Sequence, residues 1–187
     1  MLMKTPYSFL LSGLLLLASC GQDAASKETE ARVTASIRQL LVQPQDTAYV
    51  QVVHTWYKSD VPNTIKLNPK AETIYRTHAE ILQEVAAQEP KLVANPVATP
   101  EQAQGIRKGY KKLVDESTTN VQELSSLAAG TSMSEAEQLK YVSDLADKQT
   151  HQLSLIKYFG RRTAATLAQK EQQATNKRLM RAMWGHE

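Results

Sequence analysis

One segment decides the fold of this chain: Gly130-Thr-Ser-Met-Ser-Glu-Ala-Glu-Gln-Leu-Lys-Tyr-Val142. Gly130 is suited to end a helix as a left-handed cap, since glycine adopts positive φ without a steric penalty. Two Ser-x-x-Glu pairs, starting at Ser132 and at Ser134, have the spacing of a capping box that begins a helix. The segment therefore predicts a short turn between two long helices.

The helix before this turn has equally clear start signals. Thr99 can act as the N-cap, Pro100 as the first helical residue and Gln102 as the partner that closes a capping box. Apolar residues then recur at helical spacing from Ile106 to Leu127. We expect a helix over about residues 100–129.

The helix after the turn should be the longest, over roughly residues 134–182, because no proline interrupts it. Its apolar seam weakens beyond Gly160, so the distal half is expected to project from the bundle or to pair with another molecule. The seam consists of Leu139, Val142, Ala146, Gln149, Leu153, Ile156, Gly160, Thr163, Leu167 and Ala174.

Shorter helices are expected before residue 100. One should begin near Glu30 and end before Pro44, and another should span Lys70 to about Leu92. Residues 47–57 suit a helix or a strand, and we favour the helix because no partner strand is visible. The predicted fold class is all-α: an elongated helical hairpin or coiled-coil-like bundle with shorter N-terminal helices.

An apolar run near the N-terminus ends in Leu17-Ala18-Ser19-Cys20. This segment resembles the signal peptide of a bacterial lipoprotein. The resemblance implies cleavage before Cys20, attachment of lipid to the Cys20 thiol, and an outer-membrane lipoprotein facing the periplasm. Gly21, where an aspartate would favour the inner membrane, carries the outer-membrane expectation. The division is then a signal peptide over 1–19, a lipidated polar tether over 20–30 and one helical domain over 31–187.

The composition excludes several classes of protein. Seven glycines and two phenylalanines among 187 residues suit long helices better than a β-sandwich or barrel. A single cysteine rules out an internal disulfide in this chain. The formal net charge of +3 is too small to indicate nucleic-acid binding, and no nucleic-acid partner is expected.

No catalytic or metal-binding motif stands out, so we expect neither an enzyme nor a cofactor or metal protein. The chain has no glycine-rich phosphate loop, no nucleophile elbow and no pair of histidines one helical turn apart. His78 lies on an apolar stripe and is expected to be a buried core histidine. The carboxylates have structural explanations as helix caps and as ion pairs, such as Asp144 with Lys148.

The C-terminal end is basic and carries large apolar residues. Residues 157–187 contain seven lysines and arginines against two glutamates, a net charge of +5. Three interpretations stand: a solvated helix end, a docking site for a partner, and a contact with anionic lipid or nucleic acid. The candidate partner-binding residues are Arg178, Leu179, Arg181, Met183 and Trp184.

The segment 130–142 also resembles a turn in helical proteins of conjugative elements, the TrbJ/TraI-like group. Five of its residues match that turn: Met133, Glu135, Ala136, Glu137 and Leu139. Gln138 stands where the group usually has a cation. The resemblance implies an exported, non-enzymatic protein that serves a transfer apparatus in the envelope.

The sequence therefore predicts a lipid-anchored structural or interaction component of an envelope assembly, with conjugative transfer or secretion as a candidate setting. Its partners would be the membrane, through the anchor, and other envelope proteins or a second copy. The alternative is a helical lipoprotein that binds a small ligand or metal among the shorter helices, near Tyr49, Trp56, Tyr57 and His78.

Overall fold

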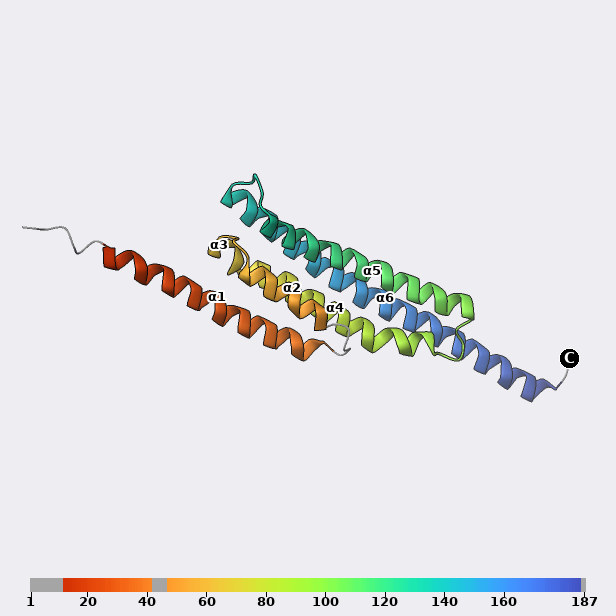
Figure 1. Cartoon of the computed structure of the whole chain (residues 1–187). Helices are drawn as coiled ribbons and strands as arrows, with labels where there is room; N and C mark the ends of the chain where they lie inside the picture. Colours follow the sequence, from red (N-terminus) through yellow and green to blue (C-terminus); the bar gives the residue numbers. More distant parts are fainter. Residues whose placement is uncertain (1–11, 42–46, 186–187) are drawn as a thin grey trace, which may run out of the picture.

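A computed structural model describes residues 12–41 and 47–185, with side chains described for 24–41 and 48–185, and no strand occurs in this part of the chain. The all-α prediction is confirmed, and residues 47–57 are helical (Figure 1). The elements are α1 (Ser12–Leu40), α2 (Thr47–Lys58), α3 (Asn63–Lys66), α4 (Pro69–Val93), α5 (Pro100–Ser126), the 3₁₀ turn η2 (Leu127–Ala129) and α6 (Glu135–Trp184).

Three long helices form the body of the molecule. The helix α4 packs against both α5 and α6, and α5 runs antiparallel to the other two (Figure 1). The predicted hairpin of α5 and α6 is present, and α4 turns it into a three-helix bundle. The helices α1 and α2 pack against each other, and α1 also packs against α4.

In the turn between α5 and α6, the start of α6 agrees with the sequence prediction and the end of α5 does not. Ser134 caps α6 and forms a complete capping box with Glu137, and Thr99 and Gln102 form the other box before α5. Gly130 has a positive φ of 97°, but its ψ of 145° lies outside the left-handed helical region. A turn of 3₁₀ helix, η2, follows the end of α5, where the sequence predicts a left-handed cap.

The first helix differs from its prediction. Residues 21–30, expected to form a polar tether, are helical, because α1 is continuous from Ser12 to Leu40. Their polar side chains reach α2: Ser26 donates a hydrogen bond of 3.4 Å to the carbonyl oxygen of Tyr57, and Glu30 contacts the ring of His54. These tertiary contacts order a segment whose own sequence has no apolar period.

The helices α5 and α6 approach closely through a reciprocal exchange of glycines and rings. A Cβ atom on Gly109 would lie 2.4 Å from the ring of Phe159, and one on Gly160 would lie 2.7 Å from the hydroxyl oxygen of Tyr110. The two rings meet edge to face with centroids 5.0 Å apart. Each helix therefore presents a glycine to an aromatic residue of the other.

The helix α6 extends beyond the helices that cover it. Leu167 is the last buried residue of α6, and from Glu171 onward the described side chains are exposed except for half-buried Ala174. With 50 residues, α6 is about twice as long as α4 and α5, which have 25 and 27. Its last turns run past the body of the bundle (Figure 1).

The glycine packing gives a prediction with an internal control. Changing Gly109 or Gly160 to alanine should lower the free energy of unfolding by about 1–2 kcal/mol, since overpacking exceeds the gain in helix propensity. Gly105→Ala, also in α5, should raise it by about 0.5–1 kcal/mol, because nothing lies within 4 Å of the added methyl group. Urea unfolding followed by circular dichroism measures all three. Equal effects at Gly105 and Gly109 would contradict the close packing.

Candidate functional site

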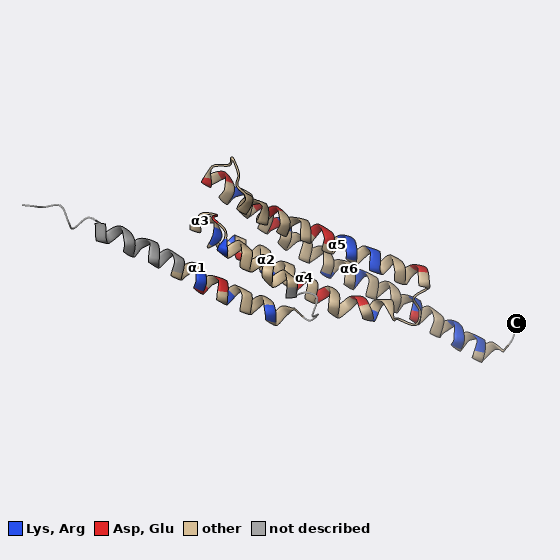
Figure 2. Cartoon of the chain, in the orientation of Figure 1, with Lys and Arg blue, Asp and Glu red and all other residues tan. Residues whose placement is uncertain are grey.

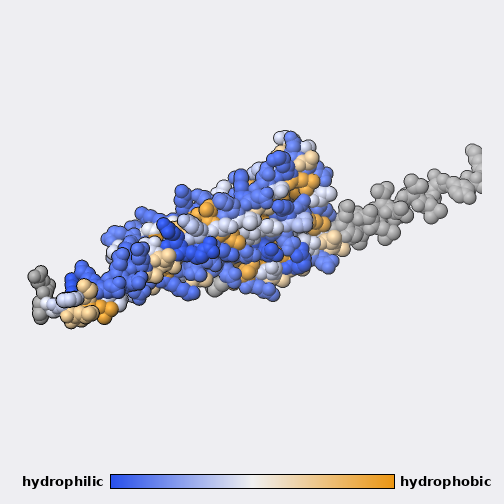
Figure 3. Space-filling model, turned by 180° about the vertical axis from the view of Figure 1, so that it is seen from behind, coloured by the Kyte–Doolittle hydropathy of each residue, from blue (hydrophilic) through white to orange (hydrophobic). Residues whose placement is uncertain are grey.

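The end of α6 gathers four of the six large apolar side chains that are exposed among the described residues, and the other two are Val52 and Tyr158. Leu179 and Met180 are 56% and 57% exposed, and Met183 and Trp184 are 74% and 75% exposed. Arg178 and Arg181 are also exposed. The structure therefore brings the five predicted partner-binding residues together, with Met180 added, in a segment that we call the α6 tip, residues 177–184. Hydrophobic residues are visible at this end in Figure 3.

The α6 tip has two distinct faces. At 3.6 residues per turn, Leu179, Met180, Met183 and Trp184 fall within an arc of about 140°. Lys177, Arg178 and Arg181 occupy the other side, and Figure 2 shows the lysines and arginines along this part of α6.

The apolar face of the tip does not continue the buried stripe of α6. On the same helical wheel, Leu167, the last buried residue, lines up with Arg178 and Arg181. The apolar arc lies about half a turn away from that line. An extension of the same bundle along the buried stripe would therefore cover the cations and leave the apolar face exposed.

The tip is defined at its end by a glycine. Gly185 has a φ of 43°, and its N–H donates a hydrogen bond of 3.1 Å to the carbonyl oxygen of Arg181. This arrangement ends α6 directly after Trp184, and glycine adopts the positive φ at this position without a steric penalty. The cations Arg178 and Arg181 also suit the negative end of the helix dipole.

The predicted lipidation residue, Cys20, lies in α1, and its side chain is outside the described part. The first described turns of α1 and the α6 tip lie at opposite ends of the molecule (Figure 1). Among the described residues no helix is long and apolar enough to span a bilayer.

A second polar feature lies inside the bundle. Ser117 Oγ lies 2.6 Å from Nδ1 of His78 and accepts a hydrogen bond of 2.5 Å from Nε2 of Gln149. Asn120 donates to Oε1 of Gln149 over 2.8 Å. These four residues, which we call the polar layer, connect α4, α5 and α6.

The polar layer separates two hydrophobic clusters. One cluster contains Trp56, Tyr75 and Leu145, and the other contains Ile81, Tyr110 and Ile156. Burial lowers the pKa of His78 to about 4, so its ring is neutral at pH 7. His78 is a buried core histidine, as its position on an apolar stripe predicts.

Side chains pack closely around Tyr49, Trp56 and His78 in the region proposed for a small ligand, and Tyr57 lines a recess at its side. The rings of Tyr49 and His78 have centroids 4.7 Å apart, and the ring centroids of Trp56 and Tyr75 are separated by 6.2 Å. Tyr49 donates a hydrogen bond of 2.8 Å to the carbonyl oxygen of Tyr75. Trp56 and Tyr57 are buried, with no hydrogen-bond partner for the indole Nε1 or the phenol oxygen in the described part.

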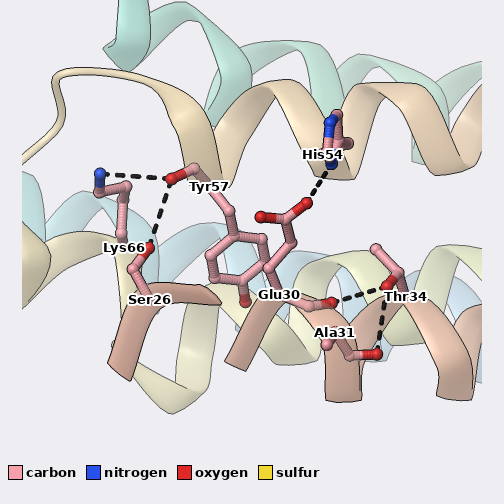
Figure 4. A network of polar contacts seen from close by, with 7 residues as sticks. All are labelled: Ser26, Glu30, Ala31, Thr34, His54, Tyr57 and Lys66. Atoms are coloured by element: carbon pink, nitrogen blue, oxygen red, sulfur yellow. Dashed lines mark hydrogen bonds and ion pairs between the residues drawn. The ribbon is translucent and has the colours of Figure 1, made fainter. Parts of the chain in front are cut away.

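A recess of about 520 Å³ opens beside this region, between α1, α2 and α3. Lys66, which is 9% exposed, donates hydrogen bonds to the carbonyl oxygens of Ser59 at 2.7 Å and Tyr57 at 3.4 Å. Figure 4 shows the hydrogen bond from Lys66 to Tyr57 beside the pair of Glu30 with His54. The ammonium group of Lys66 therefore caps the end of α2, which is a structural task.

Exposed carboxylates of α5 and α6 form ion pairs within their helices. Lys111 pairs with Asp115 at 2.6 Å, and Lys112 lies 4.0 Å from Glu116. Asp144 pairs with Lys140 at 2.8 Å, so the predicted pair with Lys148 is wrong, although the spacing of four residues is the same. No three His, Cys, Asp or Glu side chains gather as a metal-binding group among the described residues.

The chain was compared with protein families, curated proteins and solved structures. No family model matches it, and neither does a curated protein or a solved structure.

The polar layer predicts how stability depends on pH. The pKa of His78 is about 4 in the folded protein, against 6.5 for an unperturbed histidine, so the unfolded chain binds the proton first. The stabilisation is complete above pH 6.5 and is lost as the pH falls toward 4. Between pH 7 and pH 5, the wild type should lose about 2 kcal/mol more free energy of unfolding than His78→Gln. Denaturant titrations at both pH values measure this difference.

The control for this prediction is His151→Gln, which changes an exposed histidine on α6. This variant should retain the pH dependence of the wild type. If His78→Gln loses as much stability on acidification as the wild type does, the buried ring is not the group responsible.

Proposed function

We propose that this protein is a lipid-anchored structural component of a cell-envelope assembly, faces the periplasm, and docks through the α6 tip. One observation carries the proposal: four large apolar side chains and three cations are exposed on a helix that has left its bundle. Scattered exposed apolar residues need no explanation, but a contiguous group rimmed by polar residues is typical of an interaction surface.

The proposed lipid anchor and the proposed docking segment lie at opposite ends of the molecule (Figure 1). The apolar run that ends in Leu17-Ala18-Ser19-Cys20 supports lipid attachment at Cys20, with the outer membrane favoured over the inner membrane. The α6 helix of 50 residues is about 75 Å long at 1.5 Å per residue. With the N-terminal half of α1, which contains Cys20, at one end and the tip at the other, the protein would act as a rigid spacer (Figure 1).

The setting and the alternative rest on different observations. Conjugative transfer or secretion is supported by the resemblance of segment 130–142, which forms the turn and the N-cap of α6. A carrier of a small ligand or metal would need an open site near Tyr49, Trp56, Tyr57 and His78, and of these Tyr57 lines the recess between α1, α2 and α3. The close contacts of the Tyr49 and His78 rings favour docking over ligand binding as the main function.

Lipid attachment is tested at Cys20. Replacing Cys20 with alanine removes the thiol, so the protein should lose incorporation of a fatty-acid analogue and should leave the membrane fraction or remain uncut. The matched variant Gly21→Asp keeps the thiol and should stay labelled, with a shift toward the inner membrane. Metabolic labelling and membrane fractionation measure both. A wild-type mature protein without label would contradict lipidation.

Docking is tested by placing a photo-crosslinking amino acid at Met183 or, as a control, at Tyr158, which is 58% exposed on the covered half of α6. Crosslinks in whole cells are expected from position 183 and not from position 158. Trp184→Ala should weaken the interaction by roughly tenfold or more, since burying such a side chain contributes about 1.5–3 kcal/mol. Deletion after Gln173 should abolish the crosslinks and leave the helical signal of the bundle intact.

The docking and ligand-binding readings make opposite predictions for the histidines. Changing His54 and His78 to glutamine should leave crosslinking from position 183 unaffected, because both lie far along the chain from the α6 tip. If the histidine changes remove the protein's function in cells and deletion after Gln173 does not, ligand binding is favoured over docking.

A further inference from the structure

The chemistry of the α6 tip restricts what it can dock against. Between Glu171 and Gly185 the sequence has three cations and no carboxylate. On the wheel, Lys177 borders the apolar arc next to Trp184, and Arg178 and Arg181 lie on the opposite face. A surface that buries the apolar face must therefore accept positive charge at its edge.

A second copy of the chain is a poor match for this requirement. Two tips in contact would bring together six cations and no carboxylate from residues 172–184, and like charges repel. The apolar groove of about 290 Å³ between α5 and α6, lined by Ile106, Phe159 and Leu167, is bordered by Arg162 and also offers a positive charge. Charge therefore favours an anionic surface over self-association.

The length of the apolar face distinguishes a lipid surface from a protein groove. A helix that docks in a groove repeats its anchors at i, i+3, i+4 and i+7. Here the apolar arc is limited to two turns, because the preceding positions on the same side are Gln172, Gln173 and Asn176. A short helix with Trp, Leu and Met on one face and Lys and Arg on the other is typical of a segment at a bilayer interface.

We propose that the α6 tip binds the surface of an anionic lipid bilayer. Leu179, Met183 and Trp184 enter the boundary between headgroups and acyl chains, where the indole ring of tryptophan is favoured because it is apolar with one polar N–H group. Lys177, Arg178 and Arg181 lie at the level of the phosphates and are attracted by the negative surface potential. The inference rests on the proposed docking function of the tip and names its ligand.

Two contacts with lipid would reinforce each other. Once Cys20 is anchored, the tip meets a lipid surface at a high effective concentration, so a weak contact of two helical turns becomes significant. The tip can meet the membrane that holds the anchor, which would lay the bundle along that membrane. It can also meet a facing membrane, which would make the protein a tether between two lipid surfaces.

The test uses the fluorescence of the full-length lipoprotein. The chain has two tryptophans, and Trp56 is 1% exposed in the core, so a change on binding reports Trp184. The protein is reconstituted into neutral phosphatidylcholine vesicles or into vesicles of equal parts phosphatidylcholine and phosphatidylglycerol. In a third arm, anionic vesicles are added to protein held in neutral ones. A blue shift in the second arm indicates contact with the anchoring membrane, and a blue shift with vesicle clustering in the third arm indicates a facing membrane.

Variants separate the two parts of the tip. Changing Met183 and Trp184 to alanine should abolish clustering or weaken vesicle binding at least tenfold, and changing Arg178 and Arg181 to glutamine should weaken binding to anionic vesicles roughly tenfold. Tyr158→Ala is the matched control and should bind as the wild type does. Binding of the arginine variant should also lose its dependence on salt concentration.

The outcomes separate the lipid inference from the docking proposal. No blue shift in any arm would overturn lipid binding, and crosslinks from Met183 to a protein would then leave docking itself standing. An equal shift on neutral and anionic vesicles would also overturn the inference, because the cations would have no role. The expected result is a blue shift confined to anionic vesicles and reduced in the arginine variant, together with loss of vesicle clustering in the Met183 and Trp184 variant.

Discussion

The unequal length of the helices is the constraint on which the rest of this structure depends. A helix stays buried only as far as its neighbours reach, and α6 has 50 residues where α4 and α5 have 25 and 27. The first half of α6 supplies the core of the bundle, through residues such as Leu145 and Ile156. From Glu171 onward the described side chains of α6 are exposed except for half-buried Ala174, and there the apolar residues change face. The mismatch divides one helix into a structural segment and an exposed segment.

Within the covered half, the bundle is held in register by features that act at single positions. The glycines Gly109 and Gly160 fix the distance between α5 and α6, because each faces a ring of the other helix. The polar layer fixes the axial alignment of α4, α5 and α6. His78 and Gln149 can both bond Ser117 only when the three helices are correctly aligned. A buried hydrogen-bonded layer of this kind favours one alignment, because a shift along the axis would leave its members unpaired in the core.

Local signals predicted much of the fold, and contacts between distant segments account for what they missed. The capping boxes at Thr99 and Ser134 set the start of α5 and α6, because each depends on residues within one turn. The helical course of residues 21–30 was missed, since its partners Tyr57 and His54 lie in another helix. The polar layer was likewise invisible, because Ser117 and Gln149 are ordinary helix residues until the bundle places them together.

The residues of the α6 tip could be selected from the sequence by their mixture of cations and large apolar groups. The angle of about half a turn between the apolar face of the tip and the buried stripe of α6 could be found only once the structure showed that the stripe ends at Leu167.

We propose that the distal segment of α6, beyond Leu167, is free in the isolated protein and becomes covered in the envelope. Hydrogen exchange of the purified protein, compared with the same protein in its native membranes, tests this directly. An exposed helix end opens readily, so amides of residues 174–184 should exchange rapidly in the purified protein and become protected in membranes. Amides of residues 142–160 should be protected in both. Protection of the distal segment that is the same in both preparations, whether high or low, would contradict the account.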